Sequence, residues 1–273
     1  SRKALGLMRE RLHDALAAEL IADNTAHGDL KPENLVVGAE GQLHPIDLDA
    51  MFLPAFAGER SPELGTAAYQ HPARTVETFD ERIDDYPAAL ISTALHALAA
   101  DPGLGARHAG SDGLLFNPAR IPREAAYREV VALFELRGMA VQYCIARLLE
   151  SPVPQLPGLG ELLREAVRMA ERPESTPDPA GPQPELFEQE GRWGFRLAGQ
   201  VVIPPLYDNG FDFTEGLAAV RLGQTWHYID PAGRTRLSCP GCQAVKPFRN
   251  GRAQIVRNGR RAAIDPSGRI LEN

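Results

Sequence analysis

The C-terminal third of the chain repeats itself at a fixed interval, and this repeat constrains the fold most strongly. The segment Phe213–Val220 realigns with Phe248–Ile255, and Tyr228–Arg234 realigns with Ala263–Arg269, both 35 residues later. Glycines interrupt β-type runs throughout this stretch. Self-similarity at such a period is typical of stacked units, each of which buries its apolar face against the next. We therefore predict a small all-β repeat domain over residues 187–273.

Three motifs in this domain resemble the WG-repeat family. They are Trp193-Gly194, the run Ile203–Asp208 and the run Phe213–Ala218. A later copy departs from the pattern, because His227 follows Trp226 where the family has a glycine. The resemblance implies a module that binds a protein partner or substrate. Too few units are present to predict a self-sufficient solenoid.

The part before the repeats is mostly helical in pattern. A linker, 172–186, separates it from the repeats, because five prolines among small and acidic residues cannot bury a core. Apolar residues recur every three or four positions from Leu5 to Leu20, which predicts a first helix. Further helices are expected over Pro87–Ala99, Arg123–Leu136, Met139–Leu149 and Gly160–Ala170, and short strands at Val36-Val37 and His44–Leu48, joined by a turn at Gly38–Gly41. The expected fold class is α+β.

Composition limits the possible functions. The 273 residues are 44% hydrophobic and 24% charged, with a net charge of −7, so no overall field attracts nucleic acid or an anionic membrane. No apolar run reaches the roughly 20 residues of a membrane span. Three cysteines cannot form a disulfide framework and suit a reducing compartment. We expect a cytoplasmic protein that binds neither nucleic acid nor membrane.

The run His27–Asn34, His-Gly-Asp-Leu-Lys-Pro-Glu-Asn, carries the candidate chemistry. Phosphoryl transfer requires a base for the incoming hydroxyl, a cation near the transferred phosphate, and oxygen ligands for magnesium. Asp29 is the candidate base, and Lys31 the candidate cation. Asn34 and Asp47, 13 residues further on, are the candidate magnesium ligands. The alternative for Asp29 and Asn34 is that they only tie a turn.

The loop and its spacing to Asp47 resemble the catalytic loop and metal aspartate of eukaryotic-type protein kinases, which are well-known signature motifs of that family. The resemblance implies that residues 1–171 form a kinase C-terminal lobe that uses ATP and Mg²⁺. Asp29, Lys31 and Asn34 would be catalytic, and Asn34 and Asp47 would bind the metal and nucleotide. His27 would pack and hydrogen-bond locally.

Two later positions fit the same resemblance. Thr66, in Leu64–Pro72, would end an activation segment and contact Asp29 and Lys31. Asp84 would brace the backbone of the catalytic loop, and an equal alternative for Asp84 is a helix N-cap.

Three residues depart from the kinase pattern. Asp49 replaces the usual glycine after the metal aspartate, and Ala73 replaces the usual glutamate after a proline. Gly28 stands where many kinases have an arginine that grips a phosphorylated segment, which implies that no activating phosphate is needed.

Three functions follow from this sequence. The first is a bacterial-type protein serine/threonine kinase whose repeats bind a partner. Its nucleotide-gripping lobe would lie before Ser1, and the isolated chain would be inactive without it. The second is a small-molecule phosphotransferase of the aminoglycoside or choline kinase type, which shares His-Gly-Asp-Leu. The third is a non-catalytic pseudokinase scaffold.

Two weaker signals remain in the repeats. Cys239 and Cys242 form a C-x-x-C without a second pair, and we expect a turn with incidental thiols. Several arginines make the C-terminus locally basic, and no aromatic residues are interleaved to stack on bases. We expect a solvated face there, formed by Arg249, Arg252, Arg257, Arg260 and Arg261.

Overall fold

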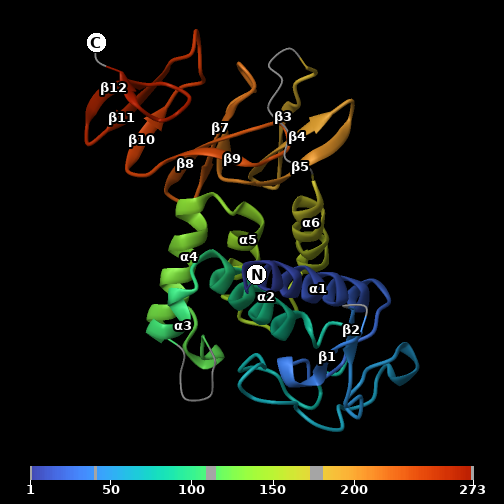
Figure 1. The fold of residues 1–273 in the computed structure, drawn as a ribbon. Helices are drawn as coiled ribbons and strands as arrows, with labels where there is room; N and C mark the ends of the chain where they lie inside the picture. Colours follow the sequence, from blue (N-terminus) through green and yellow to red (C-terminus); the bar gives the residue numbers. More distant parts are fainter. Residues whose placement is uncertain (1, 40–41, 109–114, 173–180, 272–273) are drawn as a thin grey trace. The chain divides into compact units, whose positions relative to one another are not determined.

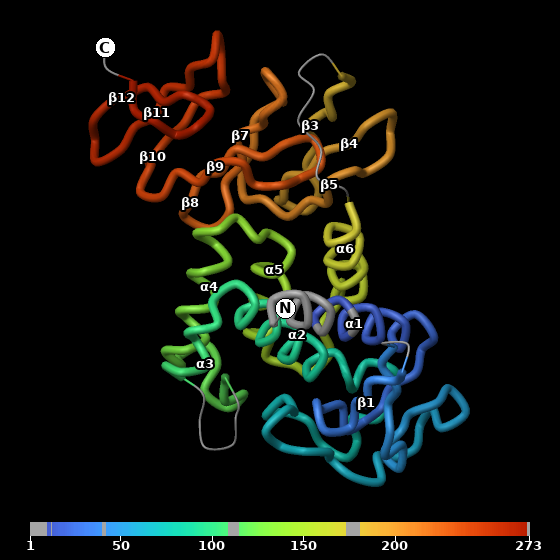
Figure 2. Tube along the Cα trace, in the orientation of Figure 1, coloured from blue at the N-terminus to red at the C-terminus, as the bar shows by residue number. Residues whose placement is uncertain are grey.

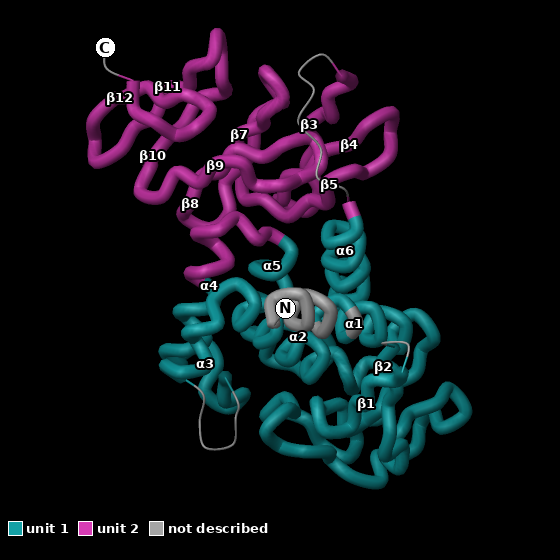
Figure 3. Tube along the Cα trace, in the orientation of Figure 1, with its two compact units in different colours: residues 1–131, 141–171 teal, residues 132–140, 172–273 magenta. Residues whose placement is uncertain are grey.

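The structure is a computed structural model that describes residues 2–39, 42–108, 115–172 and 181–271. The chain divides into two compact units, and Figure 3 colours them separately. Unit 1 comprises residues 1–131 and 141–171, and unit 2 comprises residues 132–140 and 172–273. The described residues form six α-helices and four small antiparallel sheets, so the expected α+β class is confirmed.

Helices make up most of unit 1. They are α1 (Arg2–Ala22), α2 (Asp85–Ala100), α3 (Gly103–His108), α4 (Ala125–Arg137), α5 (Ala140–Leu148) and α6 (Leu159–Glu171). The second half of α4 and the first residue of α5 belong to unit 2. Helix α1 packs against both α2 and α6 (Figure 1). Helix α2 is buried along much of its length, consistent with its almost entirely apolar sequence. Helices α2, α4, α5 and α6 lie close to their predicted bounds, α1 extends beyond its predicted stripe at both ends, and α3 was not predicted.

Two short strands of unit 1, β1 (Leu35–Val37) and β2 (Leu43–Pro45), form a hairpin with Val36 paired to His44. The predicted strand to Leu48 is therefore too long, since the ladder ends at Pro45. Asp47 has φ +63°, in the left-handed region, and a strand cannot continue through that conformation. Of the predicted turn, Glu40 and Gly41 lie outside the described residues. Short 3₁₀ helices occupy Pro32–Asn34, Pro54–Phe56 and Pro118–Arg120.

Unit 2 contains three antiparallel sheets that follow one another along the chain (Figure 2). The first is β3-β4-β5 (Glu185–Gln189, Arg192–Leu197, Gln200–Tyr207). The second is β6-β7-β8-β9 (Asn209–Gly210, Ala218–Leu222, Thr225–Ile229, Thr235–Cys239). The third is β10-β11-β12-β13 (Cys242–Val245, Ala253–Arg257, Arg260–Ile264, Ile270–Leu271).

Contacts between successive sheets recur with the sequence repeat. Ile203 packs over the Cα of Gly233, and Leu237 packs over Gly268 in the same way. Gly268 has φ +84°, a conformation that favours glycine, and a Cβ there would also lie 2.6 Å from a Leu237 methyl carbon. Aromatic rings add to the stacking, as between Tyr228 and Phe248, whose centroids are 4.7 Å apart.

Residues 132–140 contribute a short helical segment to unit 2. The Glu135 carboxylate accepts hydrogen bonds from the Gln224 N–H at 2.8 Å and the Thr225 hydroxyl at 2.9 Å. The Thr235 hydroxyl donates to the Gly138 carbonyl at 3.0 Å. These contacts fix the edge of the second sheet onto the end of α4.

His227, the residue that replaces the repeat glycine, gives unit 2 an expected sensitivity to acid. Its ring is fully buried and lies 2.9 Å from the Ser238 hydroxyl. Burial lowers the pKa of His227 to about 4, although the backbone at Glu135 opposes that shift. Between pH 6.5 and 4 the unfolded chain therefore binds a proton that the folded chain does not, so stability falls as the pH falls through this window.

We expect His227 to remove about 2 kcal/mol of stability between pH 7 and pH 5. Urea unfolding at the two pH values measures the loss. The variant His227→Gln should lose less, while substitution of the exposed His44 by glutamine should leave the loss unchanged. Equal losses in all three proteins would exclude His227 as the origin.

The predicted linker is described only in part. Of its five prolines, Pro173, Pro177 and Pro179 lie outside the described residues, while Pro182 and Pro184 lie in irregular chain just before β3. Among the helices that the structure describes, none is both long and apolar enough to cross a bilayer.

The Cys239 and Cys242 thiols are free and buried at the turn between β9 and β10. Burial raises the pKa of Cys239 to about 12, so its thiol stays protonated and unreactive.

Candidate functional site

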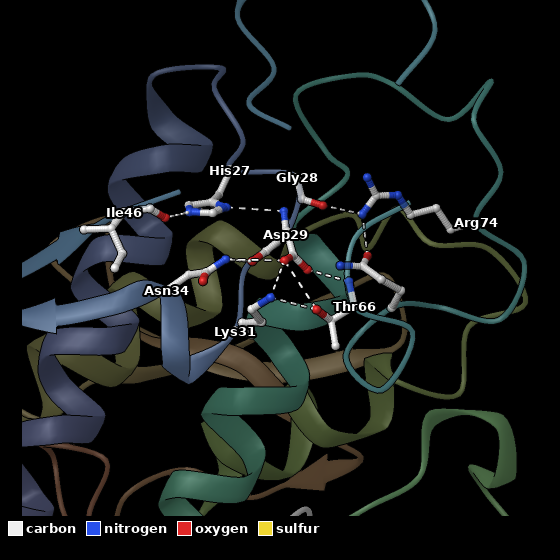
Figure 4. A network of polar contacts seen from close by, with 9 residues as sticks. His27, Gly28, Asp29, Lys31, Asn34, Ile46, Thr66 and Arg74 are labelled. Carbon is white, nitrogen blue, oxygen red and sulfur yellow. Dashed lines mark hydrogen bonds and ion pairs between the residues drawn. The ribbon is translucent and has the colours of Figure 1, made fainter. Parts of the chain in front are cut away.

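Asp29 lies at the centre of a polar network on the loop after α1 (Figure 4). Its carboxylate is nearly buried, and the Lys31 ammonium donates to Oδ2 at 2.6 Å. The Thr66 backbone N–H donates to Oδ1, and the Thr66 hydroxyl lies 3.3 Å from Oδ2. Lys31 also donates to that hydroxyl at 2.9 Å. The structure thus brings together the carboxylate, ammonium and threonine that the sequence predicted as neighbours.

The close approach of the Thr66 segment depends on Gly65. A Cβ at Gly65 would lie 2.8 Å from the Gly28 carbonyl oxygen and 2.9 Å from Asp29 Oδ1. Gly65 also has φ +68°, in the left-handed region that favours glycine. Only a glycine lets the Thr66 N–H reach the Asp29 carboxylate.

Opposing effects set the charge state of Asp29. Burial alone would raise its pKa, but hydrogen bonds from Lys31 and Thr66 outweigh burial and hold the pKa below its usual value. The hydrogen bond to Asp29 raises the pKa of Lys31, helped by the nearby Asp47 charge. At neutral pH the pair is therefore a carboxylate and an ammonium.

Asp84 supports the loop from the start of α2. Its carboxylate accepts hydrogen bonds from the backbone N–H groups of His27 and Gly28, the latter at 3.0 Å. Asp84 also occupies the N-cap position of α2, as the alternative predicted, but its side chain makes no capping hydrogen bond to that helix. Complete burial raises the pKa of Asp84, against the lowering by these two N–H donors.

His27 is also fixed by the backbone. Its Nδ1 accepts from the Asp29 N–H at 3.3 Å, so Nε2 carries the proton and donates to the Ile46 carbonyl at 2.8 Å. The ring is buried and ties the loop to the strand that leads to Asp47. This is the local packing role that the sequence indicated.

Arg74 belongs to the same network and was not predicted. Its Nη1 donates to the Gly28 carbonyl at 2.8 Å and to Gln70 Oε1 at 2.6 Å (Figure 4). The side chain is buried, which lowers the pKa of Arg74, while Asp84 and Asp29 favour its charge. The only sequence signal was its position just after the Leu64–Pro72 segment.

The β1–β2 hairpin determines where Asn34 and Asp47 lie. The Ile46 N–H donates to the Asn34 carbonyl at 2.9 Å, so the two candidate ligands flank one end of the ladder. Asp47 has φ +63°, a sparsely populated conformation for a residue other than glycine and one that recurs at functional sites.

Asn34 and Asp47 have the oxygens that a hard cation requires. Asn34 Nδ2 donates to the Asp29 carbonyl at 3.0 Å, which directs its Oδ1 away from that bond. The Asp47 side chain is exposed, and no ion pair or hydrogen bond to another described residue engages its carboxylate. Carboxylate and amide oxygens are the ligands that Mg²⁺ prefers, so this donor set fits the ion.

Several aliphatic side chains near these two residues are exposed. Four exposed aliphatic side chains lie on the hairpin and the loop around Asp47: Val36, Val37, Ile46 and Leu48. Val36 and Val37 are consecutive in β1 and point to opposite faces of the hairpin, so the four side chains do not share one face.

Comparison with known proteins bears on the repeats. The sequence model of the family described as WG containing repeat matches residues 197–226, from the end of β4 into β8. The predicted resemblance to WG repeats is confirmed over that stretch. A search of the curated proteins gave no match to the chain.

Proposed function

We propose that this protein is an ATP-dependent protein serine/threonine kinase whose WG repeats bind a protein partner or substrate. The observation that supports this most is the Asp29–Lys31–Thr66 network next to the oxygens of Asn34 and Asp47. A residue set that only tied a turn would not need a threonine contact 37 residues away, nor an exposed carboxylate at Asp47.

Asp29 would orient the hydroxyl that attacks the γ-phosphate of ATP. A carboxylate offers about four acceptor positions, and Oδ1 retains one beside its bond from the Thr66 N–H. Because its pKa is lowered, Asp29 is a weak base, best suited to hold the hydroxyl and take its proton late. Lys31, held as an ammonium, would neutralise charge on the transferring phosphoryl group.

Asn34 and Asp47 would hold Mg²⁺ through their oxygens, and the ion when bound would neutralise charge on the ATP phosphates. The exposed aliphatic side chains around Asp47 would lie against the nucleotide base or a covering lobe. The intact mass of the native protein determines whether one is present.

The assay that tests the proposal uses the native protein from its source with radiolabelled ATP and Mg²⁺. Label in a protein serine or threonine supports it. Label only in an aminoglycoside or choline would establish the small-molecule phosphotransferase instead. Absence of any transfer by a protein that includes a nucleotide-gripping lobe would leave the non-catalytic scaffold.

A pair of neighbouring carboxylates tests the metal assignment. We expect Asp47→Asn to lower phosphoryl transfer by about 10²-fold, because one negative ligand of the metal is lost. Asp49 is exposed two residues away and has no assigned role, so Asp49→Asn should retain the activity of the native protein. Titration of Mg²⁺ at fixed ATP measures both variants. Equal effects of the two substitutions would contradict the role of Asp47.

A further inference from the structure

The outer face of the third sheet of unit 2 differs from the equivalent face of the second sheet. In the second sheet, five residues face the third and form part of one core: Phe211, Leu217, Ala219, Trp226 and Tyr228. All except Phe211 are buried, and the Phe211 and Trp226 rings stack with centroids 5.8 Å apart. This face holds successive repeats together.

The repeat interval identifies the corresponding face of the third sheet. Moving 35 residues along the chain from those five positions gives Lys246, Arg252, Gln254, Arg261 and Ala263. Phe211, Leu217 and Trp226 are thus replaced by three cations. Alternation along the strands agrees, since Ala253, Ile255 and Ile264 are buried toward the second sheet while the cations are exposed.

This face, called the cationic face, contains a groove. The groove has a volume of about 410 Å³ and runs across β10, β11 and β12. Its lining includes Lys246, Gln254, Arg261, Val256 and Ala263, and none of the described residues that line it is acidic. No ion pair with another described residue engages Lys246, Arg252 or Arg261.

The sign of the charge is informative. A polar face is expected wherever no further repeat covers a sheet, because it keeps that face soluble. Solubility alone does not require one sign of charge, and the chain as a whole is acidic, with a net charge of −7. Lysine and arginine stems can also pack along a partner while their heads pair with its carboxylates.

We propose that the cationic face binds an acidic, extended segment of a protein partner in the groove across β10–β12. Carboxylates of the segment would pair with Lys246, Arg252 and Arg261, and its apolar side chains would lie on Val256 and Ala263. Nucleic acid fits less well, because the positions of Phe211 and Trp226 are cations here and no aromatic platform remains for bases.

The inference rests on the proposed role of the repeats as a partner-binding module, but it does not need phosphoryl transfer. A binding experiment without ATP therefore keeps the two proposals separate. Failure of the kinase assay would leave this result unaffected, and failure of binding would leave the assignment of Asp29 unaffected.

The experiment measures fluorescence anisotropy of a labelled short peptide of alternating glutamate and valine, titrated with the full chain. Arg261→Glu and the matched Arg260→Glu change the net charge equally, but the two side chains point to opposite sides of β12. We expect Arg261→Glu to weaken binding about tenfold and Lys246→Glu/Arg261→Glu to weaken it further. Arg260→Glu should stay near the native affinity. Circular dichroism verifies that each variant is folded.

Four results would overturn the proposal. The first is that the acidic peptide does not bind, and the second is that Arg260→Glu and Arg261→Glu weaken its binding equally. The third is that duplex DNA or phosphatidylserine vesicles bind more tightly than the peptide. The fourth is self-association that Arg261→Glu abolishes, which would identify a second copy of the chain as the occupant.

Discussion

Substitution of Asp29 by alanine in the native protein is expected to lower kcat for phosphoryl transfer by about 10²–10⁴-fold, the contribution typical of a positioned base. The expectation follows from the position of the carboxylate, which holds Lys31 and Thr66 in one network. Asp29→Asn should lower kcat in the same range. An amide retains one acceptor oxygen but presents an N–H₂ toward the ammonium that Asp29 Oδ2 now accepts from.

The matched control for Asp29 is Asp23, an exposed aspartate at the end of the same helix-to-loop stretch. Asp23→Asn should retain full activity. Thermal unfolding of each variant distinguishes lost chemistry from lost fold, since the prediction requires a folded Asp29 variant. Unchanged turnover in folded Asp29→Ala would remove the proposed role of Asp29 and favour the scaffold alternative.

The pH dependence of turnover adds a second test of Asp29. Because hydrogen bonds hold its pKa below the usual range, the carboxylate should stay ionised, and the stabilisation it contributes should be lost only as the pH falls through that lowered value. A decline of activity between pH 7 and 5 would then arise from another group. Measuring both turnover and the free energy of unfolding across this pH range shows whether a loss of activity follows the loss of stability expected from His227 in unit 2.

The local parts of this site could be predicted from sequence. The spacing of Asp29, Lys31 and Asn34 lies within one loop, and the pairing of β1 with β2 follows from two short runs around a turn. Helix positions followed from apolar periodicity, which fixes the buried face of a helix from its own residues. The short α3 was missed because six residues are too few to show a period.

Long-range parts of the site could not be predicted in the same way. Arg74 reaches Gly28 across 46 residues, and nothing in its neighbourhood in the sequence indicates that it contacts a loop carbonyl. The split of α4 between the two units is a second example. Residues 132–140 belong to unit 2 and contact its second sheet, as in the hydrogen bond from Thr235 to Gly138, which joins residues 97 positions apart. Such contacts depend on the packed fold and have no local sequence signal.

Gly28 lies in the predicted loop and also makes long-range contacts that the sequence did not indicate. Among the proposed substitutions, its replacement should have the largest effect on stability. Its φ is +82°, and a Cβ there would lie 2.1 Å from the Ala50 carbonyl oxygen, which is backbone and cannot rotate away. The residue also donates to Asp84 and accepts from Arg74. We expect Gly28→Ala to destabilise the protein by about 3–5 kcal/mol, from the left-handed conformation, the forced backbone shift and the weakened hydrogen bonds.

A second glycine provides the control for this prediction. Gly58 has φ +89°, but no heavy atom lies within 4 Å of the position that a Cβ would take, so Gly58→Ala should lose only the conformational term, about 1 kcal/mol. The expected difference in melting temperature is on the order of 10 °C, measured by circular dichroism. Equal melting temperatures would mean that Ala50 yields to a side chain. The contact with Ala50 would then not explain why position 28 is a glycine. A larger residue, such as the arginine common in kinases, could occupy the position.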